Sequence, residues 1–183
     1  MTMIEHLPNG KRLEDCHVVF IGDRTNVCSS LMHMTTRMGM HFTHAAPLKY
    51  QSPQEWVDLA KNNIAEYGGS VTVTDDVIKA VSNADFIYTD LWWWVDQEEE
   101  AEERRSFFMP QYQVTPELLA HAPKHVKFMH CLPASRGVEV VDAVMDSENS
   151  LIFDEAENRL SAQRALLVYF LYDSGESADN PTA

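Results

Sequence analysis

The amino-acid sequence predicts a doubly wound α/β domain, with about five parallel strands in one sheet and helices on both faces. Short apolar runs rich in β-branched and aromatic residues alternate with helical patterns along the chain, which is the order of a parallel sheet with crossover helices. The runs are apolar at consecutive positions, as in strands that are buried on both faces. The length of 183 residues suits a single domain.

The first half of the chain holds three strand–helix units. The strands are expected at 17–23, 41–47 and 70–74. The helical patterns that follow them lie at 26–40, 52–69 and 76–84. The second of these helices has the clearest end signals, because Ser52 is expected to cap it, with Pro53 and Glu55 in its first turn and Gly68-Gly69 at its end.

The second half continues the alternation with longer connections. Further strands are expected at 85–90 and 126–133, and helices at 91–108, 115–123 and 137–145. The segment 150–172 is predicted to hold a last strand of about four residues and a closing helix. The tail 173–183 is too polar to pack and is expected to be disordered.

Composition narrows the class of function. The chain has 28 acidic and 14 basic residues and a formal charge of -14, which disfavours nucleic acid because phosphate binding needs clustered Lys and Arg. The acidic surplus suits a cationic small molecule, or serves solubility alone. No apolar run approaches the ~20 residues that span a bilayer, and the N-terminus is unlike a signal peptide. Three scattered cysteines predict neither disulfides nor a zinc site, and they favour the cytoplasm.

Ligands of such folds bind outside the carboxyl ends of the strands. Four polar segments are expected there, namely 22–26, 89–92, 130–133 and 154–159. Dinucleotide and Walker fingerprints are absent. Cys131 is either an inert buried thiol or a functional group. Because adjacent residues on a strand point to opposite faces, His130 is badly placed to activate it, and a Cys-His hydrolase is disfavoured.

Other residues near these strand ends have two interpretations each. The run Trp92 to Trp94 is either a lid over an alkyl chain or a packing surface for another subunit or domain. Asp90 and Asn26 are either ligand-binding residues or helix caps. The acidic run 98–105 is typical of a solvated helix face.

Four segments resemble one enzyme family, in that family's order. They are FIGDRTN, YTDLW, FMHCLPASRGVEV and FDEAENRLSAQRALLV. Together they resemble the second half of the ornithine and putrescine carbamoyltransferases, and most of all the putrescine branch. The resemblance extends from Thr2 to Phe170.

The resemblance covers the amine-binding domain alone. The family's first half, a carbamoyl-phosphate-binding domain, carries S-T-R-T-R and H-P-T-Q motifs that this sequence lacks. We therefore expect 1–14 to be the end of an interdomain helix with its linker, and 15–172 to be the amine-binding domain. The isolated chain is expected to be inactive. The resemblance also implies small-molecule substrates and a homotrimeric full-length protein.

The reaction that the resemblance implies is transfer of a carbamoyl group from carbamoyl phosphate to putrescine or ornithine, without a metal or organic cofactor. Cys131 and the Leu132 carbonyl would contact the carbamoyl group, and Arg159 would stabilise its developing oxyanion. Asp90, with Cys131, would orient the attacking amine, and Asn26 would contact the far end of the substrate. The other expected substrate-binding residues are His130, Pro133, Trp92, Trp93 and Trp94.

Two departures from the family pattern bear on the substrate. Ornithine enzymes carry S-M-G shortly after the T-D-x-W segment, where this chain reads WWVDQEEE. This segment offers indole faces and carboxylates for an ammonium but no cation for an α-carboxylate, which favours a diamine. Asn26 is the ornithine-type choice at its position. Ornithine carbamoyltransferase proper, a non-catalytic amine-binding module and an interaction domain are the alternatives.

Overall fold

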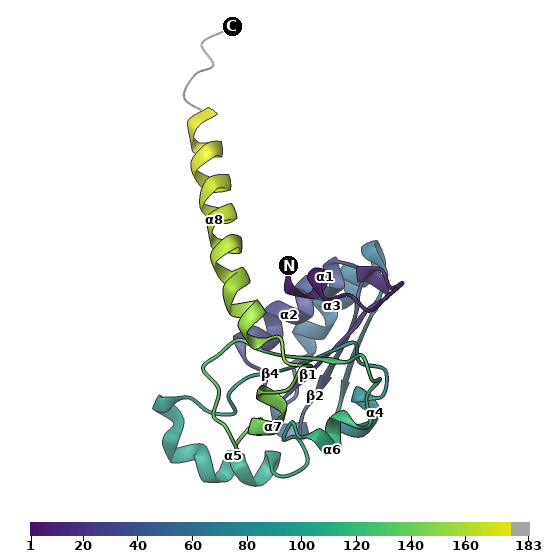
Figure 1. The fold of residues 1–183 in the computed structure, drawn as a ribbon, viewed down its shortest axis with the longest axis vertical. Helices are drawn as coiled ribbons and strands as arrows, with labels where there is room; N and C mark the ends of the chain where they lie inside the picture. Colours follow the sequence, from purple (N-terminus) through teal and green to yellow (C-terminus); the bar gives the residue numbers. More distant parts are fainter. Residues whose placement is uncertain (177–183) are drawn as a thin grey trace, which may run out of the picture.

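The computed structural model describes residues 1–176, without the side chains of 95–97 and 173–176. Its centre is a five-stranded, wholly parallel sheet in the order β3-β2-β1-β4-β5; Figure 1 labels its strands β1, β2 and β4. The strands are β1 His17–Ile21, β2 His41–Ala45, β3 Ser70–Thr74, β4 Phe86–Thr89 and β5 Lys127–His130. The predicted fold class and its five strands are confirmed.

The six helices between residues 26 and 145 are shorter than the sequence patterns suggested, and the closing helix is longer. The helices are α1 Thr2–Glu5, α2 Asn26–Arg37, α3 Gln54–Tyr67, α4 Val77–Val81, α5 Ala101–Phe108, α6 Pro116–Leu119, α7 Asp142–Met145 and α8 Ile152–Glu176. Short 3₁₀ turns lie at η1 Leu13–Asp15, η2 Leu48–Tyr50 and η3 Val95–Glu100. None of the described helices is long and apolar enough to cross a membrane.

Alternate residues of the central strand β1 enter two separate cores. Val18 and Phe20 pack with Cys28 and Met32 of α2 on one face of the sheet. Val19 and Ile21 pack on the other face, with side chains of α4, α5, α6 and α7. This two-sided burial is why the strands are apolar at consecutive positions, and it bears out the predicted helical layer on each face.

The start of α3 differs from its prediction, although its end does not. Pro53, rather than Ser52, precedes the first helical residue, and no side chain caps it. The Ser52 hydroxyl lies 2.7 Å from His44 Nδ1 instead. Ser52 thus makes a buried tertiary hydrogen bond in place of the expected bond to the first turn of the helix. Gly68 closes the helix with a φ of 83°, a conformation that glycine adopts at little cost.

The predicted last strand is wrong. Residues 146–149 form a turn, and Ser150 makes only an isolated parallel bridge to Phe128 of β5, where Leu151 N donates to Phe128 O at 2.8 Å. The chain then enters α8 directly. This helix continues past the predicted boundary at 173 as far as Glu176, and the rest of the expected tail lies outside the described residues. The helix predicted at 137–145 is likewise reduced to α7.

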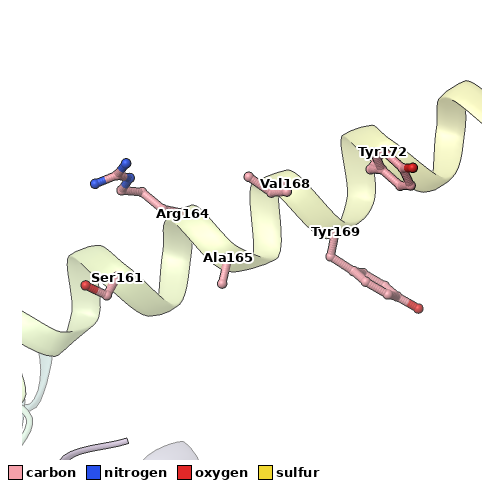
Figure 2. A pocket seen from close by; sticks show the side chains of 6 residues that line it. All are labelled: Ser161, Arg164, Ala165, Val168, Tyr169 and Tyr172. Atoms are coloured by element: carbon pink, nitrogen blue, oxygen red, sulfur yellow. The ribbon is translucent and has the colours of Figure 1, made fainter.

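Helix α8 extends away from the body of the domain, as Figure 1 shows. The N-terminal turns of α8 pack near β5. Its C-terminal part carries large exposed apolar side chains, namely Leu166, Leu167, Val168, Tyr169, Phe170, Leu171 and Tyr172. A shallow hollow of about 620 Å³ lies along this C-terminal part (Figure 2). All of its lining residues belong to α8, so it is a helix surface remote from the strand ends.

Candidate active site

Asp90 and Cys131 meet at the carboxyl ends of two neighbouring strands. The register pairs Thr89 of β4 with His130 of β5, so the residues that follow them lie side by side. Cys131 Sγ donates a hydrogen bond to Asp90 Oδ1 at 3.2 Å, and Leu91 N donates to the same oxygen at 2.8 Å. Asp90 is buried, and its Oδ2 has no partner in the described part of the chain. A buried carboxylate oxygen at the strand ends is thus left without a hydrogen-bond donor among the described residues.

A second carboxylate lies close to the same thiol. The Tyr88 hydroxyl donates to Glu155 Oε1 at 2.6 Å, and this bond ties β4 to the first turns of α8. Glu155 Oε2 is buried and, among the described residues, finds no partner. Burial raises the pKa of Glu155 above its ordinary value, against the lowering effect of Tyr88. The site therefore holds more acceptors than its own donors satisfy, which suits a ligand with N–H groups.

The Cys131 thiol is protonated at neutral pH. Burial first, and the charge of Asp90 second, raise its pKa to about 12. The thiolate is the nucleophilic form of cysteine, so this group acts as a hydrogen-bond donor and not as a covalent nucleophile. The structure agrees with the argument that disfavoured a Cys-His hydrolase.

The His130 imidazole faces away from this thiol. Its Nδ1 accepts a hydrogen bond from Leu132 N at 2.9 Å, and its Nε2 lies 3.4 Å from Glu139 Oε1. Both side chains are fully buried. His130 therefore belongs to the wall behind the Cys131–Pro133 turn.

Arg159 approaches the same strand ends from α8. It lies one helical turn after Glu155, and both residues line a cavity of about 390 Å³ with His130 and Cys131. The side chain of Arg159 is exposed. The structure thus brings Asp90, Cys131 and Arg159 to one edge of the sheet.

The other expected site residues are less uniform in position. Leu132 is half-buried and Pro133 exposed in the turn after β5. Asn26 is exposed at the first position of α2, and the helix cap is Thr25, whose hydroxyl accepts from Cys28 N at 3.3 Å. Neither Asn26 nor Asp90 serves as a helix cap.

The tryptophan run divides between core and surface. Trp92 is 1% exposed and stacks on Phe108 with ring centroids 5.0 Å apart. Its indole has no surface for a substrate, so the expected contact through Trp92 is wrong in this structure. Trp93 is half-buried, and Trp94 is 39% exposed. If the tryptophan run forms a lid over the alkyl chain of a substrate, Trp93 and Trp94 must form it.

The acidic run is more than a solvated face, because Arg104 lies buried within it. Arg104 Nη1 donates to Asp23 Oδ2 at 2.5 Å and to the Trp92 carbonyl at 3.0 Å, and its Nε donates to Glu100 Oε2 at 3.0 Å. Its guanidinium also lies 5.3 Å from the Tyr50 ring centre. One side chain thus holds α5 and the tryptophan run against the end of β1.

Sequence reasoning missed Arg104, Tyr88 and Glu139, and it gave Glu155 no role although the segment 154–159 was expected at the strand ends. Tyr88 lies inside a strand, and nothing local marks it as part of a site. The sequence holds one sign that Glu139 is unusual, because this charged residue stands between two valines in an apolar segment. No cluster of three or more metal-ligating side chains occurs within residues 1–176.

These features define a class: an α/β domain that presents carboxylates, a neutral thiol and an arginine at the carboxyl edge of its sheet. The family model for the aspartate/ornithine carbamoyltransferase Asp/Orn-binding domain matches residues 14–170. The chain belongs to this family. Its expected resemblance to the ornithine and putrescine carbamoyltransferases is confirmed.

Individual relatives agree with this assignment. The putrescine carbamoyltransferase of Mycoplasma mycoides is 59% identical over 98% of this chain and 51% of its own length. The ornithine carbamoyltransferase of Pyrococcus horikoshii is 50% identical over 84% of this chain and 48% of its own. The solved ornithine carbamoyltransferase of Pyrococcus furiosus superposes with a TM-score of 0.84 at 46% identity, over 91% of this chain and 52% of that one. The chain spans about half the length of these relatives.

Proposed function

We propose that this chain is the amine-binding half of a carbamoyltransferase that transfers a carbamoyl group from carbamoyl phosphate to putrescine. In this reaction the amine nitrogen attacks the carbamoyl carbon, the carbon–oxygen bond to phosphate breaks, and the amine loses a proton. The products are carbamoylputrescine and phosphate. The observation that carries the proposal is the Cys131–Asp90 pair, in which the second carboxylate oxygen of Asp90 is buried and has no partner in the described part of the chain.

Four site residues have a proposed role in this reaction. Asp90 orients the attacking nitrogen, because its buried Oδ2 lacks a donor and can accept an N–H bond from the amine. Cys131, which is protonated, and the Leu132 carbonyl contact the carbamoyl group. Arg159 stabilises the negative charge that develops on the carbamoyl oxygen, a role that typically contributes about 3–4 kcal/mol to the transition state. The exposed position of Arg159 leaves it free to turn toward a substrate.

Putrescine is the preferred substrate in this proposal. A site that binds the α-groups of ornithine needs a partner for the carboxylate, whereas Asp90 and Glu155 each contribute a carboxylate oxygen that lacks a donor among the described residues. Polar groups built for a missing partner reject an analogue strongly. Asn26 and the ornithine carbamoyltransferases among the relatives favour ornithine as the second candidate.

A hybrid enzyme tests both substrate and activity. The hybrid joins this chain to the part of the Mycoplasma mycoides putrescine carbamoyltransferase that this chain does not match. We expect carbamoylputrescine formation with a kcat/KM at least about tenfold above that for ornithine, and no activity from the chain alone. A tenfold preference for ornithine would overturn the diamine assignment. A thermal shift with putrescine but no turnover would indicate a binding module.

The setting of the complete protein is part of the proposal. We infer a cytoplasmic homotrimer, as the family resemblance implies. The three free cysteines suit a reducing compartment, and the exposed apolar side chains of α8 favour an assembly that covers them. Sedimentation of the hybrid enzyme measures its oligomeric state.

A further inference from the structure

His130 and Glu139 form a buried pair that the proposed chemistry leaves without a task. Both side chains are fully buried, with His130 Nε2 3.4 Å from Glu139 Oε1. Neither Nε2 nor Glu139 Oε2 has a hydrogen-bond partner in the described part of the chain. Burying two ionisable groups is costly unless they serve each other or a neighbour.

The backbone fixes which ring nitrogen carries the proton. Leu132 N donates to His130 Nδ1 at 2.9 Å, so Nδ1 is the acceptor and carries no hydrogen. The proton of the neutral ring must then be on Nε2, which faces Glu139. The carboxylate therefore favours the one tautomer that can hold the Leu132 amide.

The same pair holds the turn after β5 at two points. Glu139 Oε1 accepts from Ser135 N at 2.5 Å, while His130 holds Leu132 N. Leu132 adopts a φ of 57°, in the left-handed region that costs a residue with a Cβ about 1–2 kcal/mol. An unfavourable backbone conformation at a site persists only where surrounding contacts impose it.

We propose that Glu139 and His130 are positioning residues that fix the Leu132 backbone so that its carbonyl points at the reacting carbamoyl group. The inference rests on the proposed carbamoyl transfer for its function, although the pair itself is independent of it. Glu139 acts through His130 and through the Ser135 amide. Neither side chain touches substrate.

The tautomer of His130 is measurable on the 183-residue chain by long-range proton–nitrogen NMR. We expect the Nε2–H form in the wild type and a shift toward mixed tautomers in Glu139→Ala. An Nδ1–H ring or a freely titrating imidazole in the wild type would overturn the inference. This measurement needs no activity, so its outcome is separate from that of the proposed function.

The hybrid enzyme tests the functional consequence. Misplacement of a reacting contact by about 1 Å can cost about 100-fold in rate, so we expect Glu139→Ala to lower kcat by about 10–100-fold, with the KM for the amine within about threefold. Glu139→Gln should retain most activity, because its amide oxygen can still accept from Ser135 N and still places a partial negative charge beside His130 Nε2. The exposed Glu148→Ala is the matched control.

Two outcomes would count against the positioning role. A Glu139→Ala enzyme that melts earlier but keeps the wild-type kcat would show a purely structural pair. A loss of kcat in Glu139→Gln as large as that in Glu139→Ala would show that an oxygen acceptor for Ser135 N at this position does not sustain the rate. If the alanine variant does not fold, the glutamine variant and the wild-type tautomer still decide the matter. An inactive wild-type hybrid counts against the proposed function instead.

Discussion

The Cys131 thiol offers a prediction whose size follows from its surroundings. Burial and the charge of Asp90 raise its pKa from 9.0 to about 12. At pH 8 the thiolate fraction is then about 1 in 10,000, against about 1 in 10 for the ordinary pKa, so alkylation should be about 1,000-fold slower. Cys16 and Cys28 are fully buried, so Cys131 is the most accessible of the three thiols.

Asp90→Asn should partly restore this reactivity. A carboxylate beside a thiol disfavours the thiolate, so its removal lowers the pKa of Cys131. A unit charge at 3.2 Å contributes about 5 kcal/mol at an effective dielectric constant of about 20. Solvent screens this half-buried site, and the burial effect remains, so we expect a fall of about one to two pKa units. Alkylation at pH 8 should therefore accelerate by about 10–100-fold.

Iodoacetamide labelling followed by peptide mass spectrometry measures the rate at Cys131 alone. Asp58→Asn is a suitable control, since Asp58 lies exposed on α3. Rates measured between pH 7 and pH 10 should rise about tenfold per unit in the wild type. A wild-type Cys131 that reacts like a free cysteine, or an Asp90→Asn variant that reacts more slowly, would refute the reasoning.

Two further predictions concern arginines. Arg104→Met should lower the free energy of unfolding by about 2–4 kcal/mol, because it leaves Asp23 largely buried without its cation; the exposed neighbour Arg105→Met should change it by less than about 0.5 kcal/mol in urea unfolding. In the hybrid enzyme Arg159→Ala should reduce kcat more than Cys131→Ser, because loss of an oxyanion partner costs about 3–4 kcal/mol while serine keeps a hydroxyl donor. Equal losses would contradict the role given to Arg159.

The sequence predicted the strands well because their signal is local. The central strands β1 and β4 are almost continuous apolar runs, and burial between two helical layers selects that pattern. The edge strand β3 is marked instead by its β-branched residues, which alternate with polar ones. Helix ends were less predictable, since a tertiary contact can replace a local one. Ser52 has the character of an N-cap, yet its hydroxyl bonds to His44. The prediction of a last strand was also wrong because of a tertiary contact. Leu151 N bonds to Phe128 O of β5, but this bond belongs to no regular strand.

The site was predictable in part. Asp90 and Cys131 follow apolar strands, so the rule for parallel sheets placed them at one edge, and the family resemblance assigned their roles. Their partners were not predictable, because Tyr88 and Glu155 are separated by 67 positions in the chain. The burial of Trp92 depends on its stacking against Phe108 from α5. Long-range contacts of this kind leave no trace in a local pattern.

The bonds between β5 and the segment before α8 also bear on self-association. An open sheet edge is a template for pairing with another chain. At β5, Phe128 N donates to Asn149 O and Phe128 O accepts from Leu151 N, each at 2.8 Å, so the backbone groups of Phe128 on this edge are already occupied. The opposite edge strand, β3, carries the polar residues Ser70, Thr72 and Thr74 at alternate positions. Edge-to-edge pairing with another chain is thus obstructed at Phe128, in the middle of β5.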